Sequence, residues 1–484
     1  MKTKQAMNPY LPSYEYVPDA EPYVVDGRVY IYGSHDLFNG YSFCLGNYVC
    51  WSAPVDDLGN WRYEGCIFRR EQDPAVPAKR KLLSGMAAPD MQQGPDGRFY
   101  LYYFIGGTKM ISVAVSDTPG GPYKFYGYVH YEDDVPIGKK GEPYQFDPAV
   151  FLDDDGRVYL YTGFALTTNP ILLKGNKPTL HGPMCFELDP KDMLTVKNGP
   201  YYIGIPGKKE AVGTPYENHV FLEASSMRKF GDTYYFIYST LNSHELCYAT
   251  SKRPDGDFTF GGILVSNGDI GLPGVPDTRH ARNCTGNTHG SILELDGEYY
   301  VFYHRHSNRK QSSRQACAEK LRFENGKFYQ AEMTSCGLNG GSLAGKGLYP
   351  AYIACNLYGR YGTRFMSMIK LPRYGLPYLT QEGSDRNTGP DQYIANMCHG
   401  SVAGYKYFDL LDTKQVRVRI RGRAKGVLCI STAEKGSPAA CIAIDSAGGE
   451  KCFETELRAP GERQALYFRY EGKGSFDFLD FELL

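Results

Sequence analysis

The sequence has few of the features that mark membrane or nucleic-acid-binding proteins. No apolar run approaches the roughly 18 residues of a membrane span, and the N-terminal MKTKQAMNPY carries basic residues with no apolar segment behind them. Lys and Arg number 53 against 54 Asp and Glu, a formal net charge of -1, so nothing favours nucleic acid or an anionic membrane surface. These absences predict a cytoplasmic protein with no nucleic-acid or membrane partner.

Several catalytic and structural motifs are also missing. The 13 cysteines form no CxxC pair and no metal-ligand spacing, which favours reduced thiols over a disulfide framework or a zinc site. We expect most of them, such as Cys247 and Cys441, to be small core residues. G-x-S-x-G, G-x-x-x-x-G-K-[ST] and H-E-x-x-H are absent, which argues against a serine-hydrolase elbow, a phosphate loop and a zinc-protease helix.

The residues that are abundant favour β structure. The chain has 484 residues with 41 Tyr, 55 Gly and 30 Pro but only two Trp, a mixture that suits many short strands joined by turns. The length fits two or three domains. A mostly helical fold is therefore not expected.

One pattern recurs five times: an apolar strand, a turn of Gly and Asp, then alternating aromatics that end in Tyr. Each copy predicts a hairpin, because Asp-Gly supplies the positive φ values of a tight turn. The spacing leaves room for two more strands per copy, as at 110–116 and 245–251, so the sequence predicts an all-β, five-bladed β-propeller. An irregular β-sandwich or several small β domains is the alternative. The copies are Tyr23–Tyr32, Met91–Tyr102, Ala149–Tyr161, Ala224–Tyr238 and Ser291–Tyr303.

A polar residue precedes every hairpin at nearly the same phase. In a propeller the first strands of all blades start at one end of the central channel, so these side chains should converge on an axial pocket. Burying like charges together is costly unless function uses them, and glycoside hydrolysis needs one protonated and one ionised carboxyl group. The residues are Asp19, Asp90, Asp147, Glu223 and His289.

Three segments resemble the blade-one, blade-three and blade-four signatures of glycoside hydrolase family 43. They are YVPDAEPYVVDGRVYIYGSHD, QFDPAVFLDDDGRVYLYTG and FLEASSMRKFGDTYYFIYS, and the resemblance covers roughly residues 8–335. It implies a five-bladed propeller with inverting, metal-independent glycosidase activity and no cofactor for catalysis. It also implies that Asp19 is the general base, Glu223 the general acid and Asp147 the residue that positions and tunes the acid.

Inversion requires the two catalytic carboxyl groups to stand ~6.5–9.5 Å apart, so that a water fits beneath the anomeric carbon. We expect that spacing for Asp19 and Glu223. We also expect Asp147 to stay ionised and to raise the proton affinity of Glu223 by like-charge repulsion.

Other pocket residues follow from the resemblance or from residue type. The resemblance places His289 by the axial channel, near a water-bound structural calcium, and Asp90 in the pocket lining. It also favours Arg305 as a contact to substrate hydroxyls, with Arg309 and Arg314 as competitors. Trp51 and Phe38 could stack on a sugar face, with core packing as the alternative. Strand alternation puts His304 and His306 on the face opposite Arg305.

The repeat ends near residue 340, so we expect a propeller over 1–340 and a second domain over 341–484. Short strands there predict a small β-sandwich of jelly-roll type, and the segment resembles carbohydrate-binding module family 6. The residues where that family binds calcium and sugar differ, because Ala354 and Asn356 replace a Glu-rich strand and no Trp follows Trp61. A structural role is therefore favoured over sugar binding, for which the candidates are Tyr393, Tyr405 and Tyr407.

Residues 346–395 are rich in Gly, Tyr and Pro, and we expect them to pack on the propeller and to shape the pocket rim. The predicted function is an inverting exo-glycosidase that removes terminal pentose from plant-derived oligosaccharides, of α-L-arabinofuranosidase or β-D-xylosidase type. The alternatives are a β-D-galactofuranosidase of the same family and a non-catalytic sugar-binding propeller. The oligomeric state cannot be inferred from the sequence.

Overall fold

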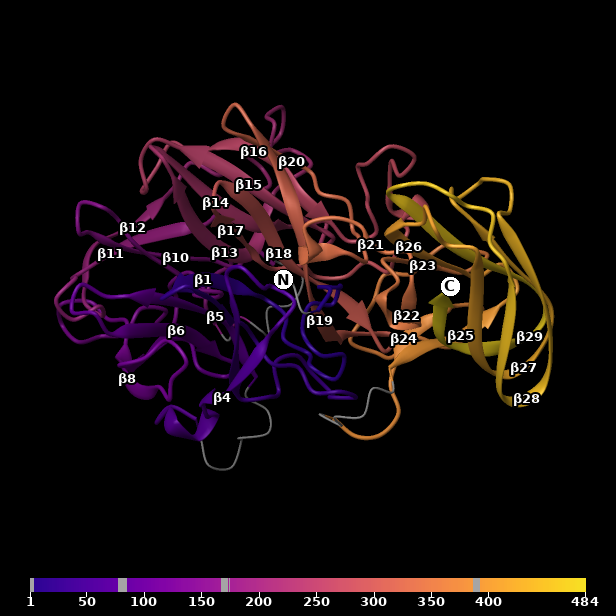
Figure 1. The fold of residues 1–484 in the computed structure, drawn as a ribbon. Coiled ribbons are helices and arrows are strands. Elements are labelled where there is room, and N and C mark those ends of the chain that lie inside the picture. Colours follow the sequence, from indigo (N-terminus) through magenta and orange to yellow (C-terminus); the bar gives the residue numbers. More distant parts are fainter. Residues whose placement is uncertain (1–3, 77–84, 167–172, 174, 386–391) are drawn as a thin grey trace.

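The computed structural model describes residues 4–76, 85–166, 173, 175–385 and 392–484. Strands dominate, and the 3-10 turns are η1 (Arg70–Gln72), η3 (Thr278–His280), η4 (Gly337–Asn339) and η5 (Ala351–Ile353). Figure 1 shows a ring of small sheets beside a second β domain formed by the C-terminal strands. None of the helices in the described ranges has the length and apolar character of a membrane span.

The ring consists of five four-stranded sheets in which each strand pairs with its neighbour in sequence, so the predicted five-bladed propeller is confirmed. Blade 1 is β1 (Glu21–Val25), β2 (Arg28–Tyr32), β3 (Tyr48–Pro54) and β4 (Arg62–Phe68); blade 2 is β5 (Met86–Gln93), β6 (Phe99–Ile105), β7 (Ile111–Ser116) and β8 (Lys124–Tyr128); blade 3 is β9 (Ala149–Leu152), β10 (Val158–Thr162), β11 (Met184–Leu188) and β12 (Val196–Tyr202). Blade 4 is β13 (Phe221–Phe230), β14 (Thr233–Thr240), β15 (Glu245–Ser251) and β16 (Thr259–Ser266); blade 5 is β17 (Ser291–Leu295), β18 (Glu298–Ser307), β19 (Lys310–Glu324) and β20 (Lys327–Tyr329).

A Tyr recurs in the second strand of every blade. In blades 1 to 3 this side chain is fully buried and its hydroxyl donates to a backbone carbonyl of the next blade. The ring supplies apolar area and the hydroxyl donates a hydrogen bond to the neighbouring blade, so one residue type both packs and links the blades. The pairs are Tyr32 with Pro119, Tyr102 with Met193, and Tyr161 with Pro254.

An N-terminal arm closes the ring by running along blade 5. The amide of Asn8 donates to the carbonyl of Ser335, and its side chain donates to the carbonyl of Ala318 and to Glu319. Farther along, Ala20 forms a parallel bridge with Gly290, which joins the entrance of blade 1 to that of blade 5. The arm therefore positions the start of β1.

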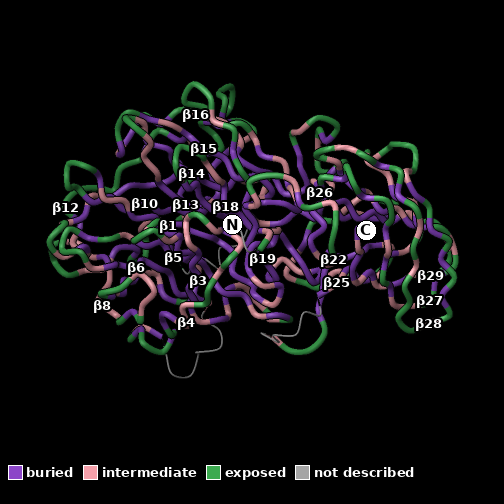
Figure 2. The backbone as a smooth tube through the Cα atoms, viewed as in Figure 1, coloured by how far each residue is buried: buried purple, intermediate pink, exposed green. Residues whose placement is uncertain are grey.

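The C-terminal strands form one nine-stranded sheet that folds over its own apolar core in a sandwich-like manner, as expected. Figure 2 shows buried residues running through both domains, with exposed residues on the outer turns. The strands are β21 (Leu343–Ala344), β22 (Gly347–Pro350), β23 (Asn356–Tyr358), β24 (Tyr378–Thr380), β25 (Tyr393–Cys398), β26 (Val402–Asp409), β27 (Gln415–Ser431), β28 (Ala440–Glu456) and β29 (Gln464–Leu483).

The cysteine expectation is confirmed in part. Cys247 is fully buried in the propeller core, as expected. Cys441 is exposed, however, and forms a disulfide with Cys429 across the β27–β28 hairpin. Sequence spacing did not indicate this pair because the two residues become neighbours only through the register of two long strands.

The stretch between β23 and β24 packs on the propeller, which confirms that expectation. The amide of Met366 donates to the carbonyl of Thr285, and the amide of Gln311 donates to the carbonyl of Ser367. Met366 also shares a small apolar cluster with Cys284 and Leu376. The C-terminal domain thus lies against the loops of blade 5.

Replacing Asn8 by Ala is expected to destabilise the propeller by about 2 kcal/mol, because the buried backbone groups of Ala318 lose their bonds to the Asn8 side chain and Glu319 loses one of its donors. Differential scanning calorimetry would show a lower unfolding temperature. Asn198→Ala removes a solvent-exposed amide–carboxylate bond and serves as the control, with little change expected. Equal stability of Asn8→Ala and the wild-type chain would contradict the closing role of the arm.

Candidate active site

Four of the five phase-related polar residues converge on one cavity of about 370 Å³. Asp19 precedes β1, Asp147 precedes β9, Glu223 lies near the start of β13, and His289 precedes β17. The side chains therefore come from blades 1, 3, 4 and 5. The cavity is lined by Asp19, Phe43, Cys44, Ala87, Tyr144, Phe146, Asp147, Phe164, Leu166, Leu222, Glu223, Ser243, Asn287, His289, Gln311 and Arg314.

The backbone turns in the same unusual way at three of these strand starts. Asp19 has φ 60° and Asp147 has φ 48°, and Ala224, directly after Glu223, has φ 69°. The left-handed region costs a residue with a Cβ roughly 1–2 kcal/mol, somewhat less for Asp. Such strain concentrates at functional sites, and here it accompanies the three carboxyl groups that face the cavity.

Arg314 on β19 balances the charge of Asp19. Its Nη1 donates to Oδ1 of Asp19 at 2.8 Å, while Nε and Nη2 donate to the two carboxylate oxygens of Asp36 at 2.8 and 3.0 Å. All three side chains are buried. Charge-assisted hydrogen bonds of this kind fix the orientation of a carboxylate and balance its negative charge, which suits Asp19 to the role of a base.

Glu223 has the opposite environment. Burial, and secondarily the negative charge of Asp19, raise its pKa to about 7, although Arg314 opposes the shift. A carboxyl group with this pKa is about half protonated near pH 7, whereas an ordinary Glu would be almost fully ionised. Glu223 can therefore donate a proton in the same cavity in which Asp19 can accept one.

Asp147 differs from the expectation that it stays ionised. Its pKa is raised well above the ordinary value, first by burial and then by the charges of Glu223 and Asp19. Oδ2 of Asp147 accepts the amide of Ala224 at 3.1 Å, a contact that favours the ionised form but does not outweigh burial. Asp147 thus anchors the backbone next to Glu223, and the two carboxyl groups retain a proton between them near neutral pH.

His289 lies between the cavity and the channel below it. Its Nδ1 is 3.6 Å from Oδ2 of Asp147, and its Nε2 is 4.0 Å from Oε1 of Glu21. Burial lowers the pKa of His289 to about 4, so the ring is neutral near pH 7. The predicted place of His289 at the axial pocket is confirmed.

Asp90 lies in the channel rather than among the residues that line the cavity. It accepts the hydroxyl of Tyr23 at 2.5 Å and the amide of Val150 at 2.8 Å. Next to it, Arg228 of β13 donates to Glu21 at 2.6 Å and to the carbonyl of Ile292 at 3.1 Å. The expectation that Asp90 lines the pocket is corrected: it links blades 1, 2 and 3 on the axis.

Three other predicted contacts lie elsewhere. Trp51 is buried in the core and donates to Oε2 of Glu15 at 2.7 Å. Arg305 is buried against the C-terminal domain, where it donates to the carbonyls of Ala354 and Tyr352 at 2.9 and 2.8 Å. Phe38 lines a separate, neighbouring pocket. Residue type suggested these roles for Trp51 and Phe38, and the family resemblance suggested one for Arg305, but the tertiary structure decides where each side chain points.

The aromatic wall of the cavity was not predicted. Phe43, Tyr144, Phe146 and Phe164 line it, and such rings pack well on the C–H face of a sugar. Phe146 directly precedes Asp147 in the QFDPAV segment, so its position was available as a signal. The others lie on loops whose path no local pattern reveals.

The metal-ligand candidates in the described residues lie outside this cavity. His219, Glu245 and Cys247 in blade 4 bring their ligand atoms within 4.8 Å of one another. Oε1 of Glu245 already accepts the hydroxyl of Thr240 and the amide of Asn242. The cavity itself offers paired carboxyl groups, which suits acid–base chemistry.

Replacing Glu223 by Gln is expected to change how stability depends on pH. The folded pKa of about 7 lies above the ordinary 4.5, so between these values the folded chain binds more protons than the unfolded chain and stability falls as pH rises. The Gln side chain of the variant does not titrate, so the stability of the variant does not fall with pH for this reason. Between about pH 4 and pH 8 its free energy of unfolding should rise relative to that of wild type by up to about 3 kcal/mol. Unfolding temperatures across that range would test this.

Glu298→Gln is the matched control, because Glu298 is exposed and pairs with Lys320. Its unfolding temperature should depend on pH in the same way as that of the wild-type chain. Parallel profiles for Glu223→Gln and wild type would contradict the raised pKa.

Comparisons with known proteins identify the family of the chain. The model of glycosyl hydrolases family 43 matches residues 8–328. A xylosidase/arabinosidase of Thermoclostridium stercorarium is 48% identical over 483 residues, 99% of each chain.

Solved structures share the fold. A β-xylosidase/α-arabinofuranosidase from a compost microbial metagenome, in complex with xylotriose and calcium-free, has a TM-score of 0.51 at 26% identity and covers 68% of this chain and 98% of its own. A family 43 arabinoxylan arabinofuranohydrolase from Bacillus subtilis, in complex with cellotetraose, has a TM-score of 0.51 at 20% identity over 100% of this chain and 99% of its own. With the propeller, the converging carboxyl groups and the family match in agreement, the chain belongs to glycosyl hydrolases family 43.

Proposed function

We propose that this protein is an inverting exo-glycosidase that releases terminal xylose or arabinofuranose from short oligosaccharides. The observation that carries the proposal is the pairing, in one cavity, of an arginine-bound carboxylate at Asp19 with a carboxyl group at Glu223 whose pKa is about 7. The relative that is 48% identical over nearly the whole chain bears the name xylosidase/arabinosidase, which supports this choice of sugars.

In this mechanism Asp19 removes a proton from water, and the water oxygen attacks the anomeric carbon from the face opposite the leaving group. The bond from that carbon to the glycosidic oxygen breaks, and Glu223 delivers its proton to this oxygen. Asp147 holds the backbone beside Glu223 by accepting the Ala224 amide. Burial and the negative charge of Asp19 disfavour loss of the Glu223 proton until the leaving group takes it.

The size of the cavity supports exo action on small substrates. About 370 Å³ lies at the lower end of the range for ligand pockets. A β-D-galactofuranosidase would use the same carboxyl groups. A propeller that only binds sugar would not need a carboxyl group whose pKa is raised to about 7. A cytoplasmic location, where only short imported oligosaccharides would be met, stays a prediction from the sequence.

For the C-terminal domain we propose a structural role within a fold like that of carbohydrate-binding module family 6. Tyr405 is fully buried and donates to the carbonyl of Ala351, and Tyr407 donates to Glu332. Neither hydroxyl is available for sugar. Tyr393, the third candidate, lines the neighbouring pocket already noted for Phe38.

The resemblance led us to expect a structural calcium near His289, but the residues there fit a different source of positive charge, the side chain of Arg228. Ca²⁺ takes six to eight oxygen ligands, whereas the unpartnered buried carboxylate oxygen near His289, among the described residues, is Oε1 of Glu21. Arg228 already places a positive charge between Glu21 and Asp90. We infer that this guanidinium balances the channel charge.

The variants Asp19→Asn and Glu223→Gln should separate the role of the base from that of the acid. Asp19→Asn should reduce kcat/KM by about 10³-fold or more on every glycoside, because the water loses its base. Glu223→Gln should lose about 10²–10⁴-fold on xylobiose but far less on 2,4-dinitrophenyl xyloside, whose leaving group needs no proton.

The measurement is the initial rate on nitrophenyl and natural substrates, with NMR of the first anomer released to establish inversion. Glu324→Gln, at an exposed position, is the control for a neutral change of charge and should leave rates unchanged. Equal loss of activity on both leaving groups in Glu223→Gln would contradict the acid assignment, and retention of configuration would contradict the role of Asp19.

Removal of metal ions by a chelator should not change the stability of the protein, whereas the substitution Arg228→Met should lower it. With EDTA the unfolding temperature and activity should match those of the untreated chain. Arg228→Met leaves Glu21 and Asp90 buried without their cation and should cost about 3 kcal/mol or more of stability. Stoichiometric calcium by elemental analysis, lost on chelation with a fall in unfolding temperature, would contradict the proposal.

A further inference from the structure

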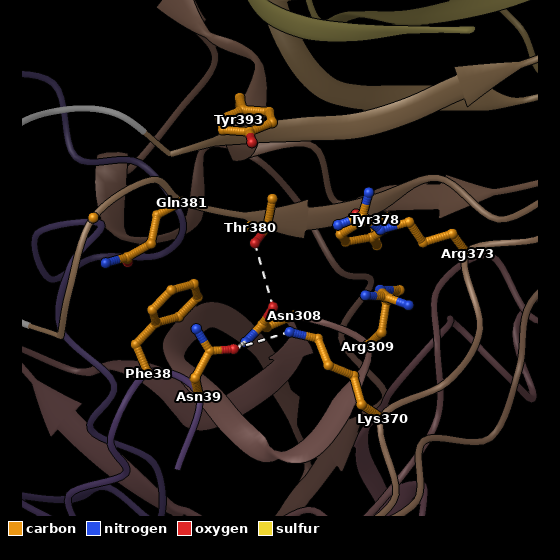
Figure 3. Close-up of a pocket in the computed structure, with 11 residues that line it drawn as sticks. Phe38, Asn39, Asn308, Arg309, Lys370, Arg373, Tyr378, Thr380, Gln381 and Tyr393 are labelled. Carbon is orange, nitrogen blue, oxygen red and sulfur yellow. Dashed lines mark hydrogen bonds between the residues drawn. The ribbon is translucent and has the colours of Figure 1, made fainter.

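A second pocket lies between the propeller and the C-terminal domain, with a volume of about 230 Å³. Blade 1 contributes the loop after β2, blade 5 contributes the β18–β19 turn, and the C-terminal domain contributes the segment before β24, β24 itself and the start of β25 (Figure 3). It is lined by Phe38, Asn39, Asn308, Arg309, Lys370, Arg373, Tyr378, Thr380, Gln381, Gly383 and Tyr393.

The pocket concentrates positive charge. Arg309, Lys370 and Arg373 line it, and its lining contains no carboxylate among the described residues. Burial, and then the charges of Arg309, Lys310 and Arg373, lower the pKa of Lys370. Like charges held together without a counter-ion are unfavourable, so this arrangement favours the entry of an anion.

Arg309 has unused hydrogen-bonding capacity in this pocket. It is 8% exposed, and its Nε is buried without a hydrogen-bond partner among the described residues. Its Nη1 donates to the carbonyl of Leu371, and its guanidinium lies 4.5 Å from the centre of the Tyr378 ring. The side chain is thus fixed in place while part of its donor fork remains unpaired, which suits a carboxylate.

The remaining lining has the character of a sugar site. Asn39 accepts hydrogen bonds from Asn308 at 2.8 Å and from Lys370 at 2.9 Å. In Figure 3 the three cations lie on one side of the pocket, with Phe38 and Gln381 opposite and Tyr393 above. Aromatic rings with amide side chains recognise the C–H face and the hydroxyls of a sugar.

The two pockets share their walls. The segment from Phe38 to Cys44 and the segment from Asn308 to Arg314 contribute residues to both. These segments are joined by the Asn308–Asn39 bond and by a bond from Lys310 to the carbonyl of Gly40. The catalytic cavity and the cationic pocket are therefore neighbours built on the same two segments.

We propose that this pocket binds the carboxylate of a uronic acid carried by the oligosaccharide, so that acidic oligosaccharides are preferred. The preference rests on the proposed function, whereas uronate binding itself does not. Among the adjoining described residues, Glu382 is paired with Arg421 at 2.6 Å, and Asp385 keeps its negative charge while it accepts the amide of Phe38 at 2.6 Å. The three cations in the lining outnumber this one carboxylate, so the pocket has a net positive charge.

The first experiment measures binding and needs no turnover. Isothermal titration of the full chain with methyl glucuronoside, methyl xyloside and sodium acetate should show the glucuronoside bound about tenfold or more tightly than either other probe. The double variant Lys370→Gln/Arg373→Gln, at two exposed positions, should remove that preference. Lys451→Gln/Lys473→Gln, the same charge change on the β28–β29 side, should retain it.

The second experiment compares kcat/KM on xylotriose with and without a glucuronic acid branch. The acidic substrate should be preferred about tenfold by wild type and by the control variant, and not by Lys370→Gln/Arg373→Gln. Equal rates on the two substrates with normal turnover would overturn the proposal and leave the proposed function intact. No turnover of either substrate, together with specific glucuronoside binding, would instead overturn the proposed function and support the pocket. Equal binding of acetate and glucuronoside would overturn the uronate assignment.

Discussion

Burying several carboxyl groups on the axis of a propeller raises the free energy of the fold unless each charge is neutralised or paired. Two arginines on different blades serve this purpose at two levels. Arg314 of blade 5 reaches Asp19 and Asp36 of blade 1 at the cavity, and Arg228 of blade 4 reaches Glu21 of blade 1 in the channel. The ion pairs that balance the buried carboxylates also link the blades, so the stability of the fold and the chemistry of the site depend on the same contacts.

The unequal distribution of that neutralising charge separates the roles of the acids. Asp19 receives a direct bond from Arg314, whereas Glu223 and Asp147 are buried without one and have raised pKa values. One fold thereby holds a carboxylate that accepts protons beside carboxyl groups that keep one. The left-handed backbone at Asp19, Asp147 and Ala224 accompanies the placement of all three side chains.

The C-terminal domain contributes to the surface around this site. Its segment before β24 packs on the loops of blade 5, and Lys370 and Arg373 from that segment meet Arg309 of the propeller. A domain that resembles a binding module but lacks its usual sugar contacts can still influence specificity, because it completes a pocket whose other half is the catalytic domain.

The repeat in the sequence was sufficient to predict five hairpins, five blades and the phase of the carboxyl groups, because strand alternation and Asp-Gly turns are local properties. The same locality explains the errors. Trp51, Arg305 and Asp90 have residue types suited to a sugar pocket, but the structure directs them into the core, against the C-terminal domain and into the channel. The Cys429–Cys441 pair depends on the register of two long strands.

Sequence by itself therefore determined which residues face the axis, since one period per blade places every strand start at the same end of the channel. Only the tertiary structure decided which acid is bound to arginine, which carboxyl groups keep a proton, and which loops form the aromatic and cationic walls. These outcomes depend on burial and on distances between residues up to 295 positions apart in the chain, as for Asp19 and Arg314. Electrostatic free energy is set by such distances and by exclusion of water, and neither is encoded in any local stretch of sequence.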